Sequence, residues 1–224
     1  MAKRVALLHT SFVFFQRERL LFDLIEKMLS DVEVTNIVDD TMLKEVMERG
    51  HITPDITRRM CHYVLAAQAI GVDVIFNTCS SLGPTMDVAR ALVDIPIVKI
   101  DDGMAEKAAR EGKRIAVLAT VPTTLKPTID LIMEKAIDIA TKPEPKPALC
   151  DGAFEILLGG DKDRHDDMVS QKAKEVSRWA DTLVLAQCSM ARLAPRLSQE
   201  TGLPVLSSPE LGVSRLKQVL EQIQ

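Results

Sequence analysis

The sequence predicts an α/β protein of two pseudo-symmetric lobes, each a parallel sheet flanked by helices. Three observations predict this fold class. Apolar, β-branched runs alternate with amphipathic segments along the 224 residues. The runs are continuously apolar, which is typical of parallel strands buried on both faces. The sequence also repeats itself at an interval of about half its length, and 224 residues suffice for two lobes with their own cores.

The predicted elements follow from these patterns in chain order. Seven apolar runs are expected to be strands, at residues 4–8, 32–37, 72–77, 97–100, 114–119, 182–187 and 205–207. Six segments with helical spacing lie between them, at residues 56–70, 85–92, 103–111, 125–139, 166–179 and 191–200. Residues 209–224 are expected to form a closing helix. The stretch TKPEPKPAL at 141–149 carries three prolines and is expected to be a rigid surface connection.

The internal repeat joins three pairs of segments in register. KRVALLHT at 3–10 matches KRIAVLAT at 113–120, with five of eight positions identical and an offset of 110. GVDVIFNTCSS matches WADTLVLAQCSM, which pairs Cys79 with Cys188 at an offset of 109. DIPIV matches TGLPVL, which pairs Pro96 with Pro204 at an offset of 108. We expect one lobe to comprise residues 1–98 with 209–224, and the other residues 99–208.

Composition and charge exclude several classes of protein. The net charge of −4 and the absence of a basic stripe argue against nucleic acid as a partner. No apolar stretch reaches the ~18 residues of a membrane span, and the start of the sequence does not resemble a signal peptide. A cytoplasmic location and no membrane partner are therefore expected.

The four cysteines are not arranged as a metal or redox site. Cys61, Cys79, Cys150 and Cys188 form no CxxC pair, and the chain has only four histidines. Neither a GxGxxG nor a GxxxxGK[ST] motif is present. We therefore expect no cofactor and no metal, and interpret all four as reduced thiols.

The positions of Cys79 and Cys188 indicate acid/base chemistry. Each follows a predicted strand, and ligands of open parallel sheets bind beyond the carboxyl ends of the strands. If the two lobes face each other, both thiols converge on an active site in the cleft between them. Two equivalent acid/base groups on opposite faces of a substrate suit stereoinversion at carbon, and a free thiol with a pKa near 8.5 is suited to proton transfer.

Polar groups around each thiol are candidates for binding the substrate. They share positions at or next to the predicted strand ends, where hydroxyls, amides and backbone N–H groups stabilise an anion. The candidates are Thr10, Ser11, Asn77, Thr78, Ser80, Ser81, Thr120, Thr123, Gln187 and Ser189.

These residues resemble the aspartate/glutamate/hydantoin racemase superfamily. The resemblance rests on NTCSS around Cys79, LAQCS around Cys188, RIAVLATVPTT at 114–124 and DIPIVKIDDGMAEKA at 94–108, and covers essentially the whole chain. It implies a cofactor-independent enzyme of two lobes in which the two cysteines are the catalytic acid/base pair. It also implies a small carboxylate or amino-acid-like substrate, held in part by Asn77, Thr78, Thr120 and Thr123, and a homodimer.

Two departures narrow the expected subtype. Glutamate racemases usually carry an acidic residue where this chain has His9, Thr10 and Ser11, and Thr-His where it has Ser189 and Met190. An aspartate- or hydantoin-type racemase or epimerase is therefore expected rather than a glutamate racemase proper. Three alternatives stay open: a maleate isomerase-like enzyme, an arylmalonate decarboxylase-like enzyme with one working thiol, and a noncatalytic small-molecule binding module.

Several of these residues also have plain structural interpretations. Cys61 and Cys150 are expected in the core, where free cysteines are usually found. Asn77 suits a turn, and Thr10 and Thr120 suit helix N-caps. The stretch GGDKDRHDD at 159–167 is expected to be a turn and an acidic helix start rather than a calcium loop.

Overall fold

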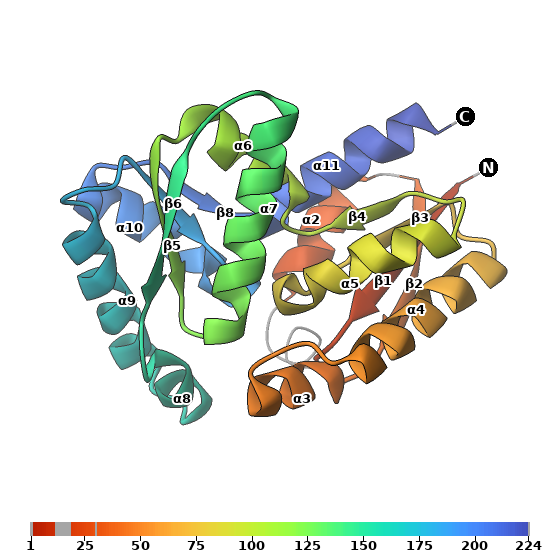
Figure 1. The fold of residues 1–224 in the computed structure, drawn as a ribbon, viewed down its shortest axis with the longest axis horizontal. Coiled ribbons are helices and arrows are strands. Elements are labelled where there is room, and N and C mark those ends of the chain that lie inside the picture. Colours follow the sequence, from red (N-terminus) through yellow and green to blue (C-terminus); the bar gives the residue numbers. More distant parts are fainter. Residues whose placement is uncertain (1, 12–18, 30, 224) are drawn as a thin grey trace. The chain divides into compact units, whose positions relative to one another are not determined.

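The computed structural model describes residues 2–11, 19–29 and 31–223. The chain divides into two compact units (Figure 1). Unit 1 comprises Met1–Asp102 and Pro209–Gln224, and unit 2 comprises Gly103–Ser208. Each unit is built around one four-stranded sheet.

The sheet of unit 1 is entirely parallel and has the order β2-β1-β3-β4. Its strands are β1 (Lys3–His9), β2 (Val32–Val38), β3 (Val74–Asn77) and β4 (Ile97–Lys99). The central strands β1 and β3 are buried from end to end apart from the first two residues of β1. This burial explains the unbroken apolar runs in their sequences.

Helices cover the sheet of unit 1. They are α2 (Leu20–Met28), α3 (Met42–Arg49), α4 (Pro54–Ala69), η1 (Ser80–Leu82), α5 (Gly83–Ala89), η2 (Arg90–Leu92) and α11 (Ser208–Gln222). The buried residues of α3, α4 and α5 pack in one cluster with Ala6, Leu8 and Ile75 of the sheet. Thr53 caps α4 by accepting a hydrogen bond from the N–H of Ile56 at 3.2 Å. The cap and the proline after it set the start of this helix, which its helical spacing predicted over residues 56–70.

The closing helix α11 approaches the backbone of β4 closely. A Cβ atom added at Gly212 would lie 2.3 Å from the carbonyl oxygen of Ile100. The Nζ atom of Lys3 donates a hydrogen bond of 3.1 Å to the carbonyl of Ile223, just beyond α11. Glycine is therefore required where α11 meets the end of β4.

Unit 2 repeats the same sheet. Its parallel strands β5 (Arg114–Ala119), β6 (Glu144–Leu149), β7 (Thr182–Leu185) and β8 (Val205–Ser207) have the order β6-β5-β7-β8. The helices are α6 (Asp102–Glu111), η3 (Pro122–Thr124), α7 (Leu125–Asp138), α8 (Ala153–Leu158), α9 (Lys162–Val176), η4 (Cys188–Leu193) and α10 (Ala194–Thr201). One core cluster joins α8, α9, η4 and α10 to this sheet.

The proline-rich stretch at 141–149 is not a plain connection, because most of it forms strand β6. The N–H of Glu144 donates to the carbonyl of Lys113, just before β5, at 2.6 Å. The N–H of Cys150 donates to the carbonyl of Ala119, the last residue of β5, at 2.8 Å. Strand residues alternate in direction, so Pro145 and Pro147 turn their missing N–H groups toward the outer edge of the sheet. An edge strand tolerates proline at these positions, which explains why a composition unsuited to a central strand still forms one here.

Three further helices, α2, α3 and α8, were not predicted from the sequence. Among the described residues, none of the three has a side-chain hydrogen bond at its N-cap. They are also short, with nine, eight and six residues. Helices this short are marginal on their own, so packing decides their conformation. By contrast, Asp161 caps α9 as expected for residues 159–167, by accepting from the N–H of Arg164.

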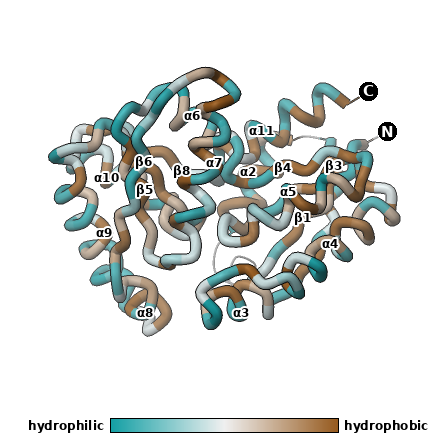
Figure 2. The backbone as a smooth tube through the Cα atoms, viewed as in Figure 1, coloured by the Kyte–Doolittle hydropathy of each residue, from teal (hydrophilic) through white to brown (hydrophobic). Residues whose placement is uncertain are grey.

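The predicted α/β class with two parallel, helix-flanked sheets is confirmed. Figure 2 shows hydrophobic residues along strands such as β1 and β8, whereas helices such as α4 and α11 alternate between hydrophobic and hydrophilic residues. Within the described residues, no helix combines the length and apolarity needed to cross a membrane.

Candidate active site

Topology brings each of the two repeated cysteines to a comparable place in its own unit. In both sheets, the second strand lies on one side of the first strand, and the third strand lies on the other side of the first strand. The crevice at this switch point, beyond the carboxyl ends of the strands, is where open α/β sheets bind ligands. Cys79 lies two residues beyond β3, and Cys188 begins η4 just beyond β7.

The thiol of Cys79 is half-buried and held in a defined environment. Burial raises its pKa. The hydroxyl of Thr10 and the backbone N–H groups of Leu82 and Ser81 act in the opposite direction by donating hydrogen bonds to the sulfur, while the charge of Asp101 adds to the increase. The net shift is upward, so Cys79 is a neutral thiol at pH 7.

Asp101 is a component of this site that sequence analysis missed. Asn77 is paired with Lys99 in the β3–β4 register, and the N–H of Ile100 donates to the carbonyl of Asn77 at 2.9 Å. Continued for two residues beyond the ends of the two strands, the same pairing places Asp101 opposite Cys79. The carboxylate is 4% exposed. The available signal was the pair of aspartates directly after a predicted strand, at the same sheet edge as the thiol.

Asn77 uses its side chain to shape the turn that carries Cys79. Its Nδ2 donates to the carbonyl of Cys79 at 3.0 Å, and the N–H of Cys79 donates to its Oδ1 at 3.3 Å. Asn77 is completely buried. Both the oxygen and the nitrogen of the Asn77 side chain are therefore hydrogen-bonded to the backbone of Cys79.

Thr78 and His9 connect three neighbouring strands. The hydroxyl of Thr78 donates to the carbonyl of Leu8 at 3.0 Å and lies 3.0 Å from Nδ1 of His9. Nε2 of His9 lies 3.1 Å from Oδ1 of Asn36 in β2. Burial lowers the pKa of His9 to about 4, although the hydrogen bond with Asn36 acts in the opposite direction. His9 is therefore neutral at pH 7 and brings no positive charge to this end of the sheet.

In unit 2, Gln187 has the role that Thr78 has in unit 1. Each residue directly precedes a cysteine and ties its strand end to the central strand. Oε1 of Gln187 accepts hydrogen bonds from the N–H of Thr120 at 2.6 Å, the N–H of Val121 at 3.1 Å and the hydroxyl of Thr120 at 3.1 Å. Cys188, which follows, is only 7% exposed.

The remaining candidates lie in the same two strand-end clusters. Ser80 and Ser81 are buried in η1, and Ser11 lies just after Thr10. Thr123 belongs to η3 and Ser189 to η4, and both are partly exposed. The 3₁₀ helix η1 directly follows Cys79 and η4 begins at Cys188. The α-helix expected over 85–92 begins two residues earlier, at Gly83, and the one expected over 191–200 begins three residues later, at Ala194.

The Cys79 cluster thus combines a thiol with hydroxyl and backbone N–H donors, which is a setting for proton transfer next to an anion. In unit 2, Cys188 follows β7, and Thr120 and Thr123 follow β5. Within the described ranges, no group of three or more His, Cys, Asp or Glu side chains is arranged to hold a metal ion.

A family model described as Asp/Glu/Hydantoin racemase matches residues 23–216. The chain belongs to this family. The protein is accordingly an isomerase of the racemase type that acts on a small molecule. A search among curated proteins found no match for this racemase.

Solved structures share the fold of this racemase at low sequence identity. Glutamate racemase isoform RacE1 from Bacillus anthracis is 15% identical with a TM-score of 0.71, over 98% of this chain and 82% of the other. Allantoin racemase from Klebsiella pneumoniae is 15% identical with a TM-score of 0.69, over 99% and 89%. A putative Asp/Glu racemase from Yersinia pestis is 15% identical with a TM-score of 0.74, over 97% and 99%.

Proposed function

We propose that the protein is a cofactor-independent racemase or epimerase that inverts the α-carbon of a small carboxylate or amino-acid-like substrate. Cys79 and Cys188 are its two acid/base residues, and it is of the aspartate or hydantoin type rather than a glutamate racemase proper. The observation that carries the proposal is the repeated placement of a thiol just beyond the third strand of each sheet. Family membership supplies the reaction class.

The reaction consists of two proton transfers. A thiolate on one face takes the α-proton, so that an S–H bond forms and the C–H electron pair moves into the adjacent carboxylate or carbonyl group. The thiol on the other face then gives its proton to the carbon, with inverted configuration. The two cysteines end with exchanged protonation states, so the reverse reaction uses the same groups in exchanged roles.

The environment of Cys79 suits the proton-donor role at the start of the cycle. Its raised pKa keeps the thiol protonated in the free protein. After it has given up its proton, the hydrogen bonds from Thr10, Ser81 and Leu82 stabilise the thiolate. We therefore propose that Cys188 removes the α-proton from one enantiomer of the substrate, and that Cys79 then gives its proton to the opposite face of the same carbon.

The predicted binding residues divide into two groups by their contacts. The side chains of Asn77, Thr78 and Gln187 are hydrogen-bonded to backbone groups of neighbouring strand ends, so we assign them to shaping the site. We assign contact with the substrate to the hydroxyl residues around the thiols. These are Thr10, Ser11, Ser80, Ser81, Thr120, Thr123 and Ser189.

Exchange of the α-proton in D₂O tests this function. The protein is incubated separately with both enantiomers of aspartate and glutamate, with allantoin and with 5-methylhydantoin, and loss of the α-proton signal is followed by NMR. We expect exchange with at least one of these compounds, and loss of that exchange in Cys79→Ser and in Cys188→Ser. Cys61→Ser is the matched control, because this partly buried thiol packs on the core of unit 1.

Other outcomes point to the alternatives. Activity retained in Cys188→Ala contradicts the two-base reaction and indicates a single-thiol enzyme of the decarboxylase or isomerase type. Binding of a compound without exchange, measured by calorimetry, indicates a binding module instead.

A further inference from the structure

The helix that carries Cys188 is unusual in its length. η4 runs over six residues, Cys188–Leu193, in 3₁₀ geometry, whereas η1 after Cys79 has three. Runs of 3₁₀ helix beyond three or four residues are uncommon, because their hydrogen bonds are poorly aligned. A segment of this kind needs contacts outside itself to keep one conformation.

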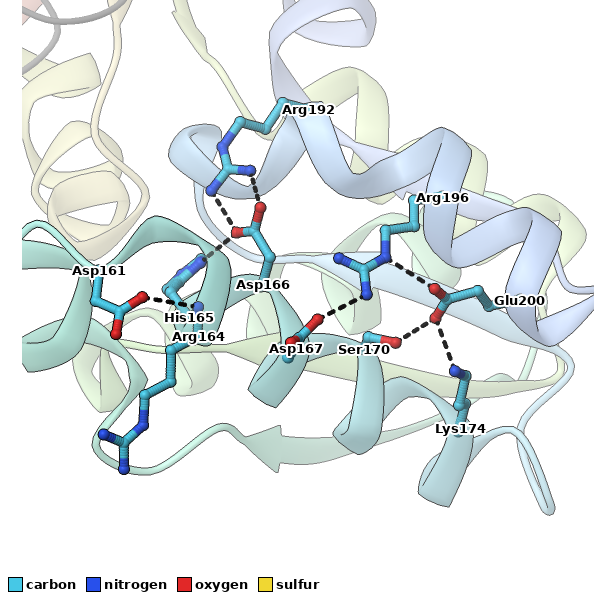
Figure 3. A network of polar contacts seen from close by, with 10 residues as sticks. All are labelled: Asp161, Arg164, His165, Asp166, Asp167, Ser170, Lys174, Arg192, Arg196 and Glu200. Atoms are coloured by element: carbon cyan, nitrogen blue, oxygen red, sulfur yellow. Dashed lines mark hydrogen bonds and ion pairs between the residues drawn. The ribbon is translucent and has the colours of Figure 1, made fainter.

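Such a contact is present one turn after the cysteine. The guanidinium of Arg192 in η4 forms ion pairs with both carboxylate oxygens of Asp166 in α9 (Figure 3). Nδ1 of His165 lies 2.7 Å from Oδ1 of the same carboxylate. A two-pronged arginine–carboxylate pair fixes orientation as well as distance. We call these three residues the η4 anchor.

Two members of the η4 anchor, His165 and Asp166, are buried. His165 has no exposed surface, and Asp166 is 8% exposed. Burial by itself would raise the pKa of Asp166, but the hydrogen bonds from Arg192 and His165 outweigh it and lower the pKa. Asp166 is therefore ionised at neutral pH, and its pairing with Arg192 persists there.

The internal repeat shows that the fold itself does not require this anchor. Subtracting the offset of 109 from Arg192 gives position 83, which is a glycine in unit 1. Gly83 has no side chain to form an ion pair, and the space where its Cβ would lie borders Cδ of Lys99 at 3.6 Å. The anchor is thus a feature of the Cys188 side alone.

We infer that Asp166 and His165 are positioning residues for Cys188: together with Arg192 they hold η4 against α9 and so fix the direction of the second thiol. This inference rests on the proposed two-base function for its catalytic meaning. The structural part stands on the contacts of η4 alone.

The chain offers a matched control next to the anchor. Asp167 adjoins Asp166 in α9 and pairs with Arg196 of α10 at 2.8 Å (Figure 3). Its side chain is 72% exposed, and its partner lies in the helix after η4. Asp166→Asn and Asp167→Asn therefore make the same chemical change at neighbouring positions, one inside the anchor and one outside it.

Alkylation by iodoacetamide, quantified by mass spectrometry of the cysteine peptides, tests the inference. Full-length wild type, Asp166→Asn and Asp167→Asn are compared across pH, at a temperature well below the melting point of each. At high pH, where the thiol is fully ionised, the alkylation rate reaches a plateau. We expect this plateau rate to rise about tenfold at Cys188 in Asp166→Asn and to stay within twofold of wild type at Cys79. Asp167→Asn is expected to change neither rate.

Two results would overturn the inference. One is an unchanged Cys188 rate in folded Asp166→Asn, and the other is an equal rise at both cysteines, which means that the ion pair only supports overall stability. Should Asp166→Asn fail to fold, Arg192→Lys provides the comparison, because lysine keeps the charge but loses the two-pronged geometry. An intermediate rise at Cys188 alone is then expected.

Kinetics supplies a second measurement, on whichever of aspartate, glutamate, allantoin or 5-methylhydantoin the wild type racemises. Asp166→Asn should lower kcat at least tenfold with KM within threefold, and Asp167→Asn should leave both unchanged. A change in KM with kcat unaffected contradicts a positioning role. The alkylation measurement needs no substrate, so failure of the anchor and failure of the proposed function are separable.

Discussion

At the scale of single residues, Asp101 and Thr10 act on Cys79 in opposite directions. The carboxylate of Asp101 raises the pKa of the thiol, and the hydroxyl of Thr10 lowers it. We predict that Asp101→Asn lowers the pKa of Cys79, because removal of a nearby like charge favours the thiolate. Below that pKa, each unit of decrease gives about tenfold more thiolate, so iodoacetamide alkylation of Cys79 at pH 8 becomes faster.

The control for this prediction is Asp94→Asn. Asp94 is exposed and lies just before β4, at the opposite end of the strand from Asp101. Thr10→Val should shift the alkylation profile of Cys79 toward higher pH, and Thr10→Ser should leave it unchanged. A profile unchanged in Asp101→Asn would contradict the placement of this charge beside the thiol.

Cys150 gives a residue-scale prediction about stability. It is 3% exposed at the end of β6, and burial raises its pKa to about 12, although the nearby charge of Lys172 acts in the opposite direction. Between the ordinary thiol pKa of about 8.5 to 9 and this value, the unfolded chain loses the proton while the folded protein keeps it. The free energy of unfolding therefore decreases as pH rises through this window, by about 1.4 kcal/mol per pH unit from this group.

Urea unfolding of wild type and Cys150→Ala at pH 8, 9.5 and 10.5 measures this contribution. The difference between the two proteins at pH 8 reports the lost packing. From pH 9.5 to 10.5, the wild type should lose about 1.4 kcal/mol more than the variant. Parallel pH dependences would show that Cys150 is accessible to water.

At the scale of structural elements, the junction between β3 and η1 depends on Asn77. Replacement by Ala leaves the N–H and the carbonyl of Cys79 without their side-chain partners in a buried place. We predict that Asn77→Ala lowers the free energy of unfolding by about 1–3 kcal/mol, the usual cost of unsatisfied buried polar groups. Gln68→Ala also removes a side-chain-to-backbone hydrogen bond, but an exposed one, and should cost less. Equal losses in urea unfolding would contradict the structural role of Asn77.

The elements also show how far the sequence could be interpreted. The repeat marks Cys79 and Cys188 as equivalent positions, and their strands were identifiable because two buried faces require continuous apolar runs. β6 was missed because its prolines are acceptable only at a sheet edge, and edge position depends on strand order rather than on local sequence. Asp101 was signalled only by its place after a predicted strand, and its pairing with Cys79 depends on strand register. The η4 anchor depends on packing between α9 and η4, which neighbours in sequence do not reveal.

At the scale of the whole molecule, Gly212 is a point of close approach between the closing helix and the rest of unit 1. Alanine is favoured over glycine inside a helix by about 1 kcal/mol, but its Cβ would lie 2.3 Å from the carbonyl oxygen of Ile100. We predict a net loss of about 2 kcal/mol in Gly212→Ala, within the range of overpacking costs. Gly159→Ala is the control, because its Cβ would meet only ordinary contacts at 3.4 Å and beyond. Thermal unfolding of both variants decides the matter: a Gly212→Ala variant as stable as wild type would contradict the close approach of α11.

The division of the chain between the units has a consequence for biosynthesis. Unit 2 is one continuous segment, Gly103–Ser208, whereas unit 1 needs residues from both sides of it. As the ribosome extends the chain, every contact of unit 2 becomes available before α11 has been made. Unit 1, although most of it is synthesised first, must wait for that helix. The nascent chain should therefore complete unit 2 before unit 1.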